Sequence, residues 1–359
     1  MCGFALPPHV VHARVNSQNI STTAGGGVTS ALMSHRIRWG ILGTGKIAHQ
    51  FANALRRMPD AELFAVGSRS AGSAGRFADE FEVVRHYASY AELVSDSDVE
   101  VIYVATPHSC HAENTRLALD AGKAVLCEKP FTINAAQTRE VIKSARERKL
   151  FLMEAMWTRC FPLMKKLREL LASGAIGEVR QLTADFGFRA EYQDEPRLFG
   201  PEFGGGALLD VGVYPVSLAS LLFGPPTKIV SAANLGPTGV DEEASVILTH
   251  GRGEMAILHT AIRLETAQEA IITGTQGRIR IHSPWWRPVA MTLSRDDKPD
   301  ERLDFPLEGN GYEYEAIEVM SCLRAGKLES PLMPLDESLS IMETLDAIRA
   351  QWGLKYPME

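Results

Sequence analysis

The chain has 359 residues, a formal net charge of −7, and 45% hydrophobic and 23% charged residues. Its length exceeds one hydrophobic core of usual size, so we expect two domains of ordinary globular composition. The negative charge argues against nucleic acid or an anionic membrane surface as a partner. We expect no membrane span, because the apolar runs are read as shorter than the ~18 residues needed. The five cysteines form no C-x-x-C pair, which indicates reduced thiols in a cytoplasmic protein.

Residues 1–35 differ in composition from the rest of the chain. They contain Pro7-Pro8 and the small, polar run Ser21–Gly27, and they show no periodic apolar face. The pattern predicts a flexible N-terminal tail. It lacks the apolar centre of a secretory signal. One interpretation is that Met33 is the natural start and that the preceding residues come from an upstream reading of the gene.

A glycine-rich turn follows the first predicted strand, Ile37–Leu42. Gly43, Gly45 and Ala48 match the G-x-G-x-x-G/A fingerprint of a dinucleotide-binding βαβ unit. The glycines permit the turn and the approach of a pyrophosphate, and a helix beginning near Lys46 offers free N–H groups. A glycine turn can be only a turn, but here the required strand and helix flank it. The cofactor-binding residues predicted in this stretch are Gly43, Thr44, Gly45, Lys46 and Ile47.

The second predicted strand, residues 62–67, ends in Ser68 and Arg69. In NAD-binding units an acidic residue at this strand end binds the ribose 2′-hydroxyl, whereas an arginine accommodates a 2′-phosphate. Ser68 takes the place of the acid and Arg69 follows it, so NADP is favoured over NAD. The alternative is that Arg69 is a solvated arginine in a turn.

Two further strand ends carry polar residues that we expect to face the cofactor. The strand at 99–105 ends in Thr106, Pro107 and His108, with His111 nearby, and this loop is expected under the nicotinamide half. The two histidines could suggest a metal, but no third ligand has fitting spacing. We therefore predict no metal site, and His111 is read as a packing residue at a helix N-terminus.

The strand at 124–127 ends in Glu128, Lys129 and Pro130. A lysine at this position lies where cofactor and substrate meet. It can donate a hydrogen bond to a carbinol oxygen or lower the pKa of a neighbouring acid. A solvated surface lysine is the alternative. Together these patterns predict a doubly wound parallel sheet over residues 36–155, with further strands at 86–87 and 150–153 and with helices at 74–81, 90–93, 111–121 and 134–148.

Residues 156–359 have a different pattern, which predicts an α/β domain with a large, open, mostly antiparallel sheet. Within it, Asp210 and Tyr214 follow the triple glycine 204–206 and are four residues apart. On a helix they would share one face, which suggests polar chemistry in a cleft. The predicted strands are 178–189, 227–235, 243–250, 253–263, 267–274 and 277–282, and the predicted helices are 162–171, 312–325 and 335–352, of which the last is expected to pack back on the first domain.

Longer stretches carry a more specific signal. The segments Ala121–Pro130 and Phe151–Arg159, and the pattern Gly205–Asp210 followed by Tyr214, resemble the glucose-fructose oxidoreductase/inositol dehydrogenase (Gfo/Idh/MocA) family. The resemblance runs from Arg38 to near Pro357. It is greatest to the dimeric trans-1,2-dihydrobenzene-1,2-diol dehydrogenases, which also act as NADP-linked D-xylose dehydrogenases.

The resemblance implies roles for particular residues. Lys129 is the catalytic lysine, Tyr214 the acid/base tyrosine and Asp210 the associated carboxylate. It also implies that Trp157, Arg159 and Phe186 line the substrate pocket, although interdomain core is an alternative for all three. The family's usual asparagine is His108 here, as in the dihydrodiol branch, which leaves its role open.

We therefore expect an NADP-dependent oxidoreductase that acts on a sugar such as D-xylose or on a cyclic trans-diol. We also expect a homodimer packed sheet to sheet, because a monomer would leave the open sheet exposed. Two other classes remain open: an enzyme that keeps a bound cofactor as an internal redox group, and a dinucleotide-binding sensor without activity. The intact set of Lys129, Asp210 and Tyr214 argues against the sensor.

Overall fold

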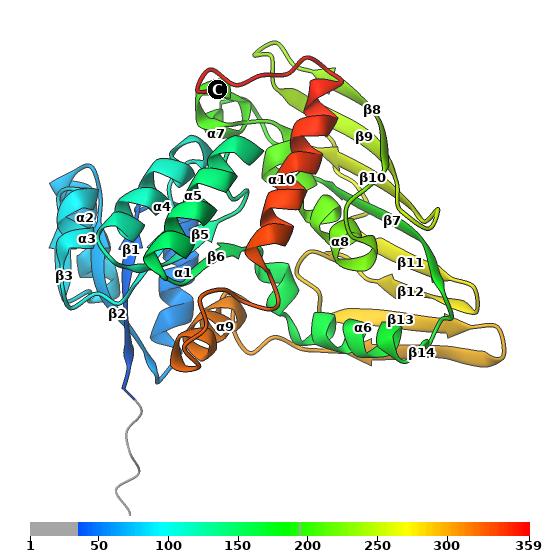
Figure 1. Ribbon diagram of the computed structural model, residues 1–359, viewed down its shortest axis with the longest axis horizontal. Coiled ribbons are helices and arrows are strands. Elements are labelled where there is room, and N and C mark those ends of the chain that lie inside the picture. The colour runs from blue at the N-terminus through cyan, green and yellow to red at the C-terminus, as the bar shows by residue number, and fades with distance from the viewer. Residues whose placement is uncertain (1–34, 194) are drawn as a thin grey trace, which may run out of the picture. The chain divides into compact units, whose positions relative to one another are not determined.

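The computed structural model describes residues 35–193 and 195–359, so the predicted tail lies outside the described residues. The first sheet has six parallel strands in the order β3-β2-β1-β4-β5-β6 (Figure 1). This is the order of a doubly wound dinucleotide-binding sheet, as predicted. Its strands are β1 (Ile37–Leu42), β2 (Ala61–Gly67), β3 (Arg85–Tyr87), β4 (Val101–Val104), β5 (Ala124–Glu128) and β6 (Leu152–Ala155).

Helices cover both faces of this sheet. Trp39 and Tyr103 belong to a hydrophobic cluster with Phe51 of α1 and Phe77 of α2, whereas Ile102 belongs to a second cluster with side chains of α3, α4 and α5. The crevice for a ligand in such a fold lies where the strand order reverses, here between β1 and β4. The helices are α1 (Lys46–Arg56), α2 (Ala71–Phe81), α3 (Tyr90–Ser95), the 3₁₀ turn η1 (His108–Cys110), α4 (His111–Asp120) and α5 (Ala135–Arg148).

The second sheet has eight strands in the order β14-β13-β12-β11-β7-β10-β9-β8. All of its pairs are antiparallel except β7 with β10, so the expected large, mostly antiparallel sheet is confirmed. The strands β13 and β14 were not predicted. The strands are β7 (Val179–Gly187), β8 (Lys228–Leu235), β9 (Asp241–Thr249), β10 (Met255–Ala261), β11 (Ala270–Gly274), β12 (Gly277–Ile281), β13 (Ala290–Arg295) and β14 (Lys298–Asp304).

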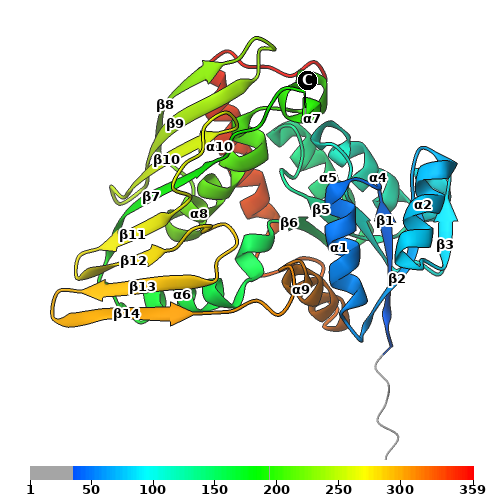
Figure 2. The ribbon, with the colours of Figure 1, turned by 180° about the vertical axis from the view of Figure 1, so that it is seen from behind.

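Helices lie on one face of this second sheet. Figures 1 and 2 show α6, α8 and α10 on the side toward the first sheet, with no helix on the other side among the described residues. The helical segments of this part are η2 (Trp157–Cys160), α6 (Pro162–Ala172), α7 (Pro196–Phe199), η3 (Pro201–Phe203), the π-helical turn η4 (Leu208–Gly212), α8 (Val213–Phe223), α9 (Glu313–Arg324) and α10 (Leu335–Ala350).

One stretch corrects an expectation from the sequence. Pro201–Phe223 is 23 residues long and apolar enough to cross a membrane by length and composition, contrary to the expectation that no run is long enough. However, 78% of its apolar window is buried inside the structure, and α8 packs against β7, β10 and α10. A helix that is apolar all round is typical of a protein core as well as of a membrane. This single stretch is therefore weak evidence for a span.

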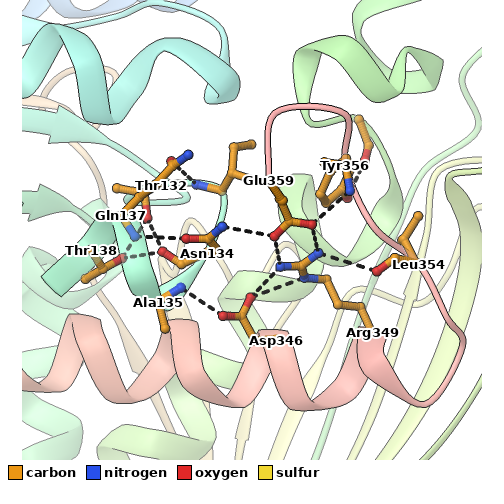
Figure 3. A network of polar contacts seen from close by, with 12 residues as sticks. Thr132, Asn134, Ala135, Gln137, Thr138, Asp346, Arg349, Leu354, Tyr356 and Glu359 are labelled. Carbon is orange, nitrogen blue, oxygen red and sulfur yellow. Dashed lines mark hydrogen bonds and ion pairs between the residues drawn. The ribbon is translucent and has the colours of Figure 1, made fainter. Parts of the chain in front are cut away.

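The last residues of the chain contact the first sheet's helices. Asp346 in α10 accepts a hydrogen bond from the backbone N–H of Ala135 at 2.8 Å, and Asn134 donates to Glu359 at 3.0 Å (Figure 3). Arg349 joins the two carboxylates, at 2.7 Å from Asp346 and 2.6 Å from Glu359. Asn134 also caps α5, so this network holds the start of α5 against α10.

Candidate active site

The turn between β1 and α1 has the geometry that a dinucleotide requires. Gly43 has a φ of +114°, and a Cβ there would lie 2.6 Å from the carbonyl oxygen of Ala105. Gly45 has an ordinary φ of −82°, and no heavy atom lies within 4 Å of where its Cβ would be. The first glycine is thus required by the chain itself. The second leaves open space in front of the N-terminus of α1, where a pyrophosphate fits.

Ser68 and Arg69 follow β2 directly beside this turn, because the N–H of Gly43 donates to the carbonyl of Gly67 at 2.9 Å. Ser68 is buried, and its hydroxyl lies 3.5 Å from that of Thr44. Arg69 is exposed. Their place at the strand end agrees with a site for the adenosine ribose, and the preference for a 2′-phosphate stays a prediction.

A cleft of about 480 Å³ continues from the glycine turn toward the second sheet. Ten of the residues predicted for the site line it: Gly45, Lys46, Ile47, Thr106, Pro107, His108, His111, Glu128, Lys129 and Asp210. Four more were not predicted: Gln50, Ala105, Glu195 and Arg197. The cleft therefore joins the tips of β1, β4 and β5 to the segment between β7 and α8.

Lys129 lies close to both Asp210 and Tyr214, the two other residues predicted to be catalytic. Its Nζ donates to the backbone carbonyl of Asp210 at 2.6 Å and lies 3.6 Å from that residue's Oδ1. The same nitrogen lies 5.2 Å from the centre of the Tyr214 ring. The prediction that Asp210 and Tyr214 share one regular α-helix is wrong, because Asp210 belongs to the π-helical turn η4 and Tyr214 to α8. They are nevertheless arranged about one ammonium group.

The charge of Asp210 is stabilised by its neighbours. Burial alone would raise the pKa of this carboxyl, but the cations Lys129 and Arg197 outweigh burial and hold the pKa below its usual range. Asp210 is therefore ionised near neutral pH.

Tyr214 is a buried phenol in an aromatic surround. Its Oη accepts a hydrogen bond from Trp157 Nε1 at 2.9 Å. Burial raises the pKa of Tyr214 well above its usual range, although the hydrogen bond from Trp157 acts in the opposite direction. Phe186 lies edge-on to the ring at 5.3 Å and stacks on Trp286 at 4.8 Å. Because of this raised pKa, Tyr214 carries its proton at neutral pH.

The two histidines of the loop after β4 are fully occupied by protein partners. His108 Nδ1 lies 3.0 Å from the carbonyl of Gly204, and its Nε2 lies 3.1 Å from Arg197 Nη1. His111 contacts the carbonyls of Pro130 and Thr106 at 2.8 and 2.9 Å, one with each ring nitrogen. Burial lowers its pKa to about 4, although both carbonyls favour the protonated ring. No group of three His, Cys, Asp or Glu side chains among the described residues is placed to hold a metal ion.

Glu128 supports the loop that carries Lys129. Its Oε2 accepts the backbone N–H of Lys129 at 3.1 Å, and its Oε1 accepts the phenol of Tyr103. Burial raises the pKa of Glu128. The side chain thus has protein partners on both oxygens, and contact with a cofactor stays a prediction.

The three residues predicted to line the substrate pocket have different surroundings. Trp157 and Phe186 are buried, and both lie against Tyr214. Arg159 is only 2% exposed and bonds to the backbone and side chain of Ser217 and to Glu337, at 2.7 to 3.1 Å. None of the three is among the residues that line the cleft, and Arg159 joins η2 to α8 and α10. These partners all lie within residues 156–359, so Arg159 is buried inside the second domain, and its role in a substrate pocket stays a prediction.

Several residues of this region escaped prediction because they come from distant parts of the sequence. Trp286 and Tyr312 complete the aromatic surround of Trp157, the latter stacked at 4.2 Å. Arg197 and Glu195 lie in a polar segment with no strand end or glycine turn to mark it. The only local signal is Pro196, which begins α7 and places Arg197 within that short helix.

Comparison with known proteins agrees with this geometry. Residues 37–156 match the oxidoreductase family with an NAD-binding Rossmann fold, and residues 164–280 match the GFO/IDH/MocA C-terminal domain. The chain belongs to the Gfo/Idh/MocA oxidoreductase family. The resemblance inferred from the sequence is confirmed. As a member of this family the protein is an oxidoreductase. The matched NAD-binding Rossmann fold explains why the turn at Gly43 and Gly45 suits a dinucleotide.

The relatives fall in the expected branch of the family. The chain is 38% identical to the D-xylose 1-dehydrogenase (NADP(+)) of Hypocrea jecorina, over 90% of this chain and 94% of that one. It is 39% identical to the trans-1,2-dihydrobenzene-1,2-diol dehydrogenase of Mus musculus, over 90% and 99%. Among solved structures, a 3-ketoreductase from Actinomadura kijaniata in complex with NADP and TDP-benzene superposes with a TM-score of 0.80 at 28% identity. That match covers 88% of this chain and 98% of the other.

Proposed function

We propose that this protein is an NADP-dependent dehydrogenase that acts on a carbinol or carbonyl carbon of a sugar such as D-xylose or of a cyclic trans-diol. The observation that carries the proposal is the position of Lys129. Its ammonium group lies between the ionised Asp210 and the phenol-bearing Tyr214, at the end of a cleft that begins at the dinucleotide turn. The proposal is supported by two relatives, one named a D-xylose 1-dehydrogenase (NADP(+)) and the other a trans-1,2-dihydrobenzene-1,2-diol dehydrogenase.

The residues divide the chemistry between them. A nicotinamide bound in the cleft supplies or accepts the hydride. Tyr214 Oη donates a proton to the substrate oxygen in reduction and accepts one in oxidation. Because its pKa is raised, the phenol form is the resting state, so reduction proceeds without prior ionisation. In oxidation the phenol must first lose its proton, so we expect oxidation to speed up as the pH rises.

Lys129 and Asp210 together form the binding position for the substrate oxygen. The ammonium group is held by the carbonyl of Asp210 and retains further N–H donors for that oxygen. It also stabilises the negative charge that develops there or on Tyr214. Trp157 assists, because its indole N–H already points at Tyr214 Oη and strengthens its bond as charge develops. Phe186, stacked on Trp286, packs edge-on against Tyr214 and helps to fix the orientation of its ring.

We also propose that the bare face of the second sheet joins a second copy of the chain in a cytoplasmic homodimer. A row of paired residues crosses five strands there, and it consists of Val230, Ile247, Ile257, Thr183 and Ile271. Val230, Ile247 and Ile257 are 51%, 40% and 39% exposed. Adjacent exposed apolar side chains such as Val230, Ile247 and Ile257 are typical of a protein interface.

The first test is cofactor turnover with a panel of aldoses and cyclic trans-diols, measured with both NADP and NAD. Tyr214→Phe should then lower turnover by about 10²–10⁴-fold, the usual contribution of general acid–base catalysis. The variant leaves the indole N–H of Trp157 buried without its acceptor, a cost of about 1–3 kcal/mol in unfolding free energy. Thermal unfolding must therefore be measured alongside.

Two results would count against this proposal. Near-full turnover by folded Tyr214→Phe, under conditions where hydride transfer limits the rate, would reduce Tyr214 to a packing residue. Cofactor that stays bound and never accumulates in its other redox state would instead indicate the internal-redox class.

A further inference from the structure

Arg197 holds together two groups that come from different parts of the fold. It lies in α7, and its side chain is 40% exposed to the cleft. Nη1 lies 3.1 Å from His108 Nε2, and Nη2 lies 3.4 Å from Asp210 Oδ1. His108 follows β4 of the first sheet, whereas Asp210 precedes α8. One guanidinium group thus bridges the loop beneath the expected nicotinamide position and the carboxylate beside Lys129.

These contacts determine the form of the His108 ring. The carbonyl of Gly204 can only accept, so the Nδ1 atom facing it carries hydrogen. A guanidinium group can only donate, so the Nε2 atom facing Arg197 presents its lone pair. His108 is therefore neutral with hydrogen on Nδ1. Burial, reinforced by the charge of Arg197, lowers the pKa of His108 well below its usual value.

The surroundings offer His108 a second state. Its Nε2 lies only 3.5 Å from Asp210 Oδ1, close enough for an ion pair if the ring gained a proton. The charged or titratable groups that face the ring are Arg197, Asp210, Lys129 and His111. Arg197 is the only one of these four that takes the lone pair of Nε2. An imidazolium at His108 would compete with Lys129, which lies 3.6 Å from the same Oδ1.

We propose that Arg197 is a positioning residue that keeps His108 neutral and thereby prevents a charged imidazolium from competing with Lys129 for the Asp210 carboxylate. The catalytic part of this inference rests on the proposed function, whereas the state of His108 does not. Arg197 acts on the reaction indirectly, through its contacts with His108 and Asp210. Its loss should therefore alter the pH dependence of turnover, and not merely the amount of folded enzyme.

The test compares Arg197→Met with the unmutated protein by following the His108 ring with ¹⁵N-label NMR between about pH 5 and pH 8, around the ordinary histidine pKa. This measurement uses the protein without cofactor or substrate, so its result does not depend on the proposed function. We expect His108 to stay neutral in the unmutated protein. In the variant the pKa of His108 should rise from its lowered value into this pH range, because the charge of Arg197 is gone while Asp210 stays beside Nε2.

Turnover provides the second measurement. If His108 titrates at about pH 7, Arg197→Met should lose about tenfold in kcat between about pH 8 and pH 6, following the neutral fraction of the ring. Arg197→Met/His108→Asn should lack this fall, because the titrating ring is gone. Arg197→Lys should restore the flat profile in part, since it retains a cation and a donor.

Arg148→Met is the matched control, because Arg148 is 41% exposed and pairs with Asp120 far from the cleft. Its pH profile should equal that of the unmutated enzyme. A His108 ring that stays neutral throughout in folded Arg197→Met would overturn the proposal. So would an acid fall of equal size in Arg197→Met and in the double variant. If His108 shifted its titration in Arg197→Met as expected but the unmutated enzyme were inactive on the whole substrate panel, the proposed function would be contradicted and the role of Arg197 would stand.

Discussion

The substitution Gly45→Ala tests whether the glycine turn is needed for stability of the fold or for binding of the cofactor. A Cβ at Gly45 meets no heavy atom within 4 Å, and its φ of −82° suits any residue. The substitution should therefore leave the fold intact. It should even raise the unfolding free energy by about 0.4–1 kcal/mol, because alanine has fewer unfolded conformations than glycine.

The same Cβ lies in the space through which a pyrophosphate must approach the backbone. Losing one hydrogen bond to a charged phosphate oxygen costs about 1.5–3 kcal/mol, which corresponds to a dissociation constant about 10- to 150-fold higher. Isothermal titration with NADP and with NAD measures that constant, and urea unfolding measures the stability. Both cofactors should weaken alike, since the pyrophosphate is common to them.

Gly43→Ala is the contrasting variant. Its Cβ would lie 2.6 Å from the Ala105 carbonyl oxygen, at a φ of +114° that alanine rarely adopts. We expect a loss of stability of about 1–3 kcal/mol, together with weaker binding. The reasoning would be refuted if Gly45→Ala bound NADP as tightly as the unmutated protein, because the open space before α1 would then not be the phosphate site.

Three further predictions concern other parts of the molecule. Arg69→Ala should weaken NADP binding by about 1.5–3 kcal/mol and leave NAD binding unchanged; equal affinity for both cofactors before mutation would contradict this. Burial raises the pKa of Asp241 to about 7, so its contribution to stability is full below about pH 4 and is lost as the pH rises through 7. Asp241→Asn should flatten this part of the pH–stability curve in urea unfolding, and an unchanged slope would exclude Asp241 as its source. Ile247→Arg should yield monomers in analytical ultracentrifugation, whereas Ile317→Arg, at a helix position of 47% exposure, should not; dimers in both variants would place the interface elsewhere.

The parts of the site that were predictable are those encoded by a local pattern. Gly43 and Lys129 directly follow the strands β1 and β5, and each strand is marked by a short, mostly apolar run. Gly45 follows two residues after Gly43, at the start of α1. In a parallel sheet the carboxyl ends of the strands meet at one edge, so the sequence alone places these residues together. Asp210 and Tyr214 were found through their spacing, although the π-helical turn between them was not foreseen.

The parts that were missed depend on distant contacts or on weak patterns. Arg197 lines the cleft and Trp286 stacks on Phe186 beside Tyr214, and each contacts residues that lie far away in the sequence. The strand β14 is almost entirely exposed and highly charged, with Pro299 within it, so it shows no alternation of apolar and polar residues. Proline and charges are typical of an edge strand, and this character hides such strands from pattern analysis.

The contacts of α10 and of residues 356–359 with α5 and the triple-glycine turn determine when the structure around the cleft can be completed during synthesis. Residues 134 and 359 are hydrogen-bonded but 225 positions apart. Tyr356 likewise donates to the carbonyl of Gly205 at 2.7 Å, within the triple-glycine turn before Asp210. The first sheet can form on the ribosome once its six strands have emerged. The loop that follows Lys129 and the turn that leads to Asp210 gain these supports only after residues 346–359 have been synthesised. A nascent chain whose first sheet has already formed therefore still lacks part of the framework around Lys129 and Asp210.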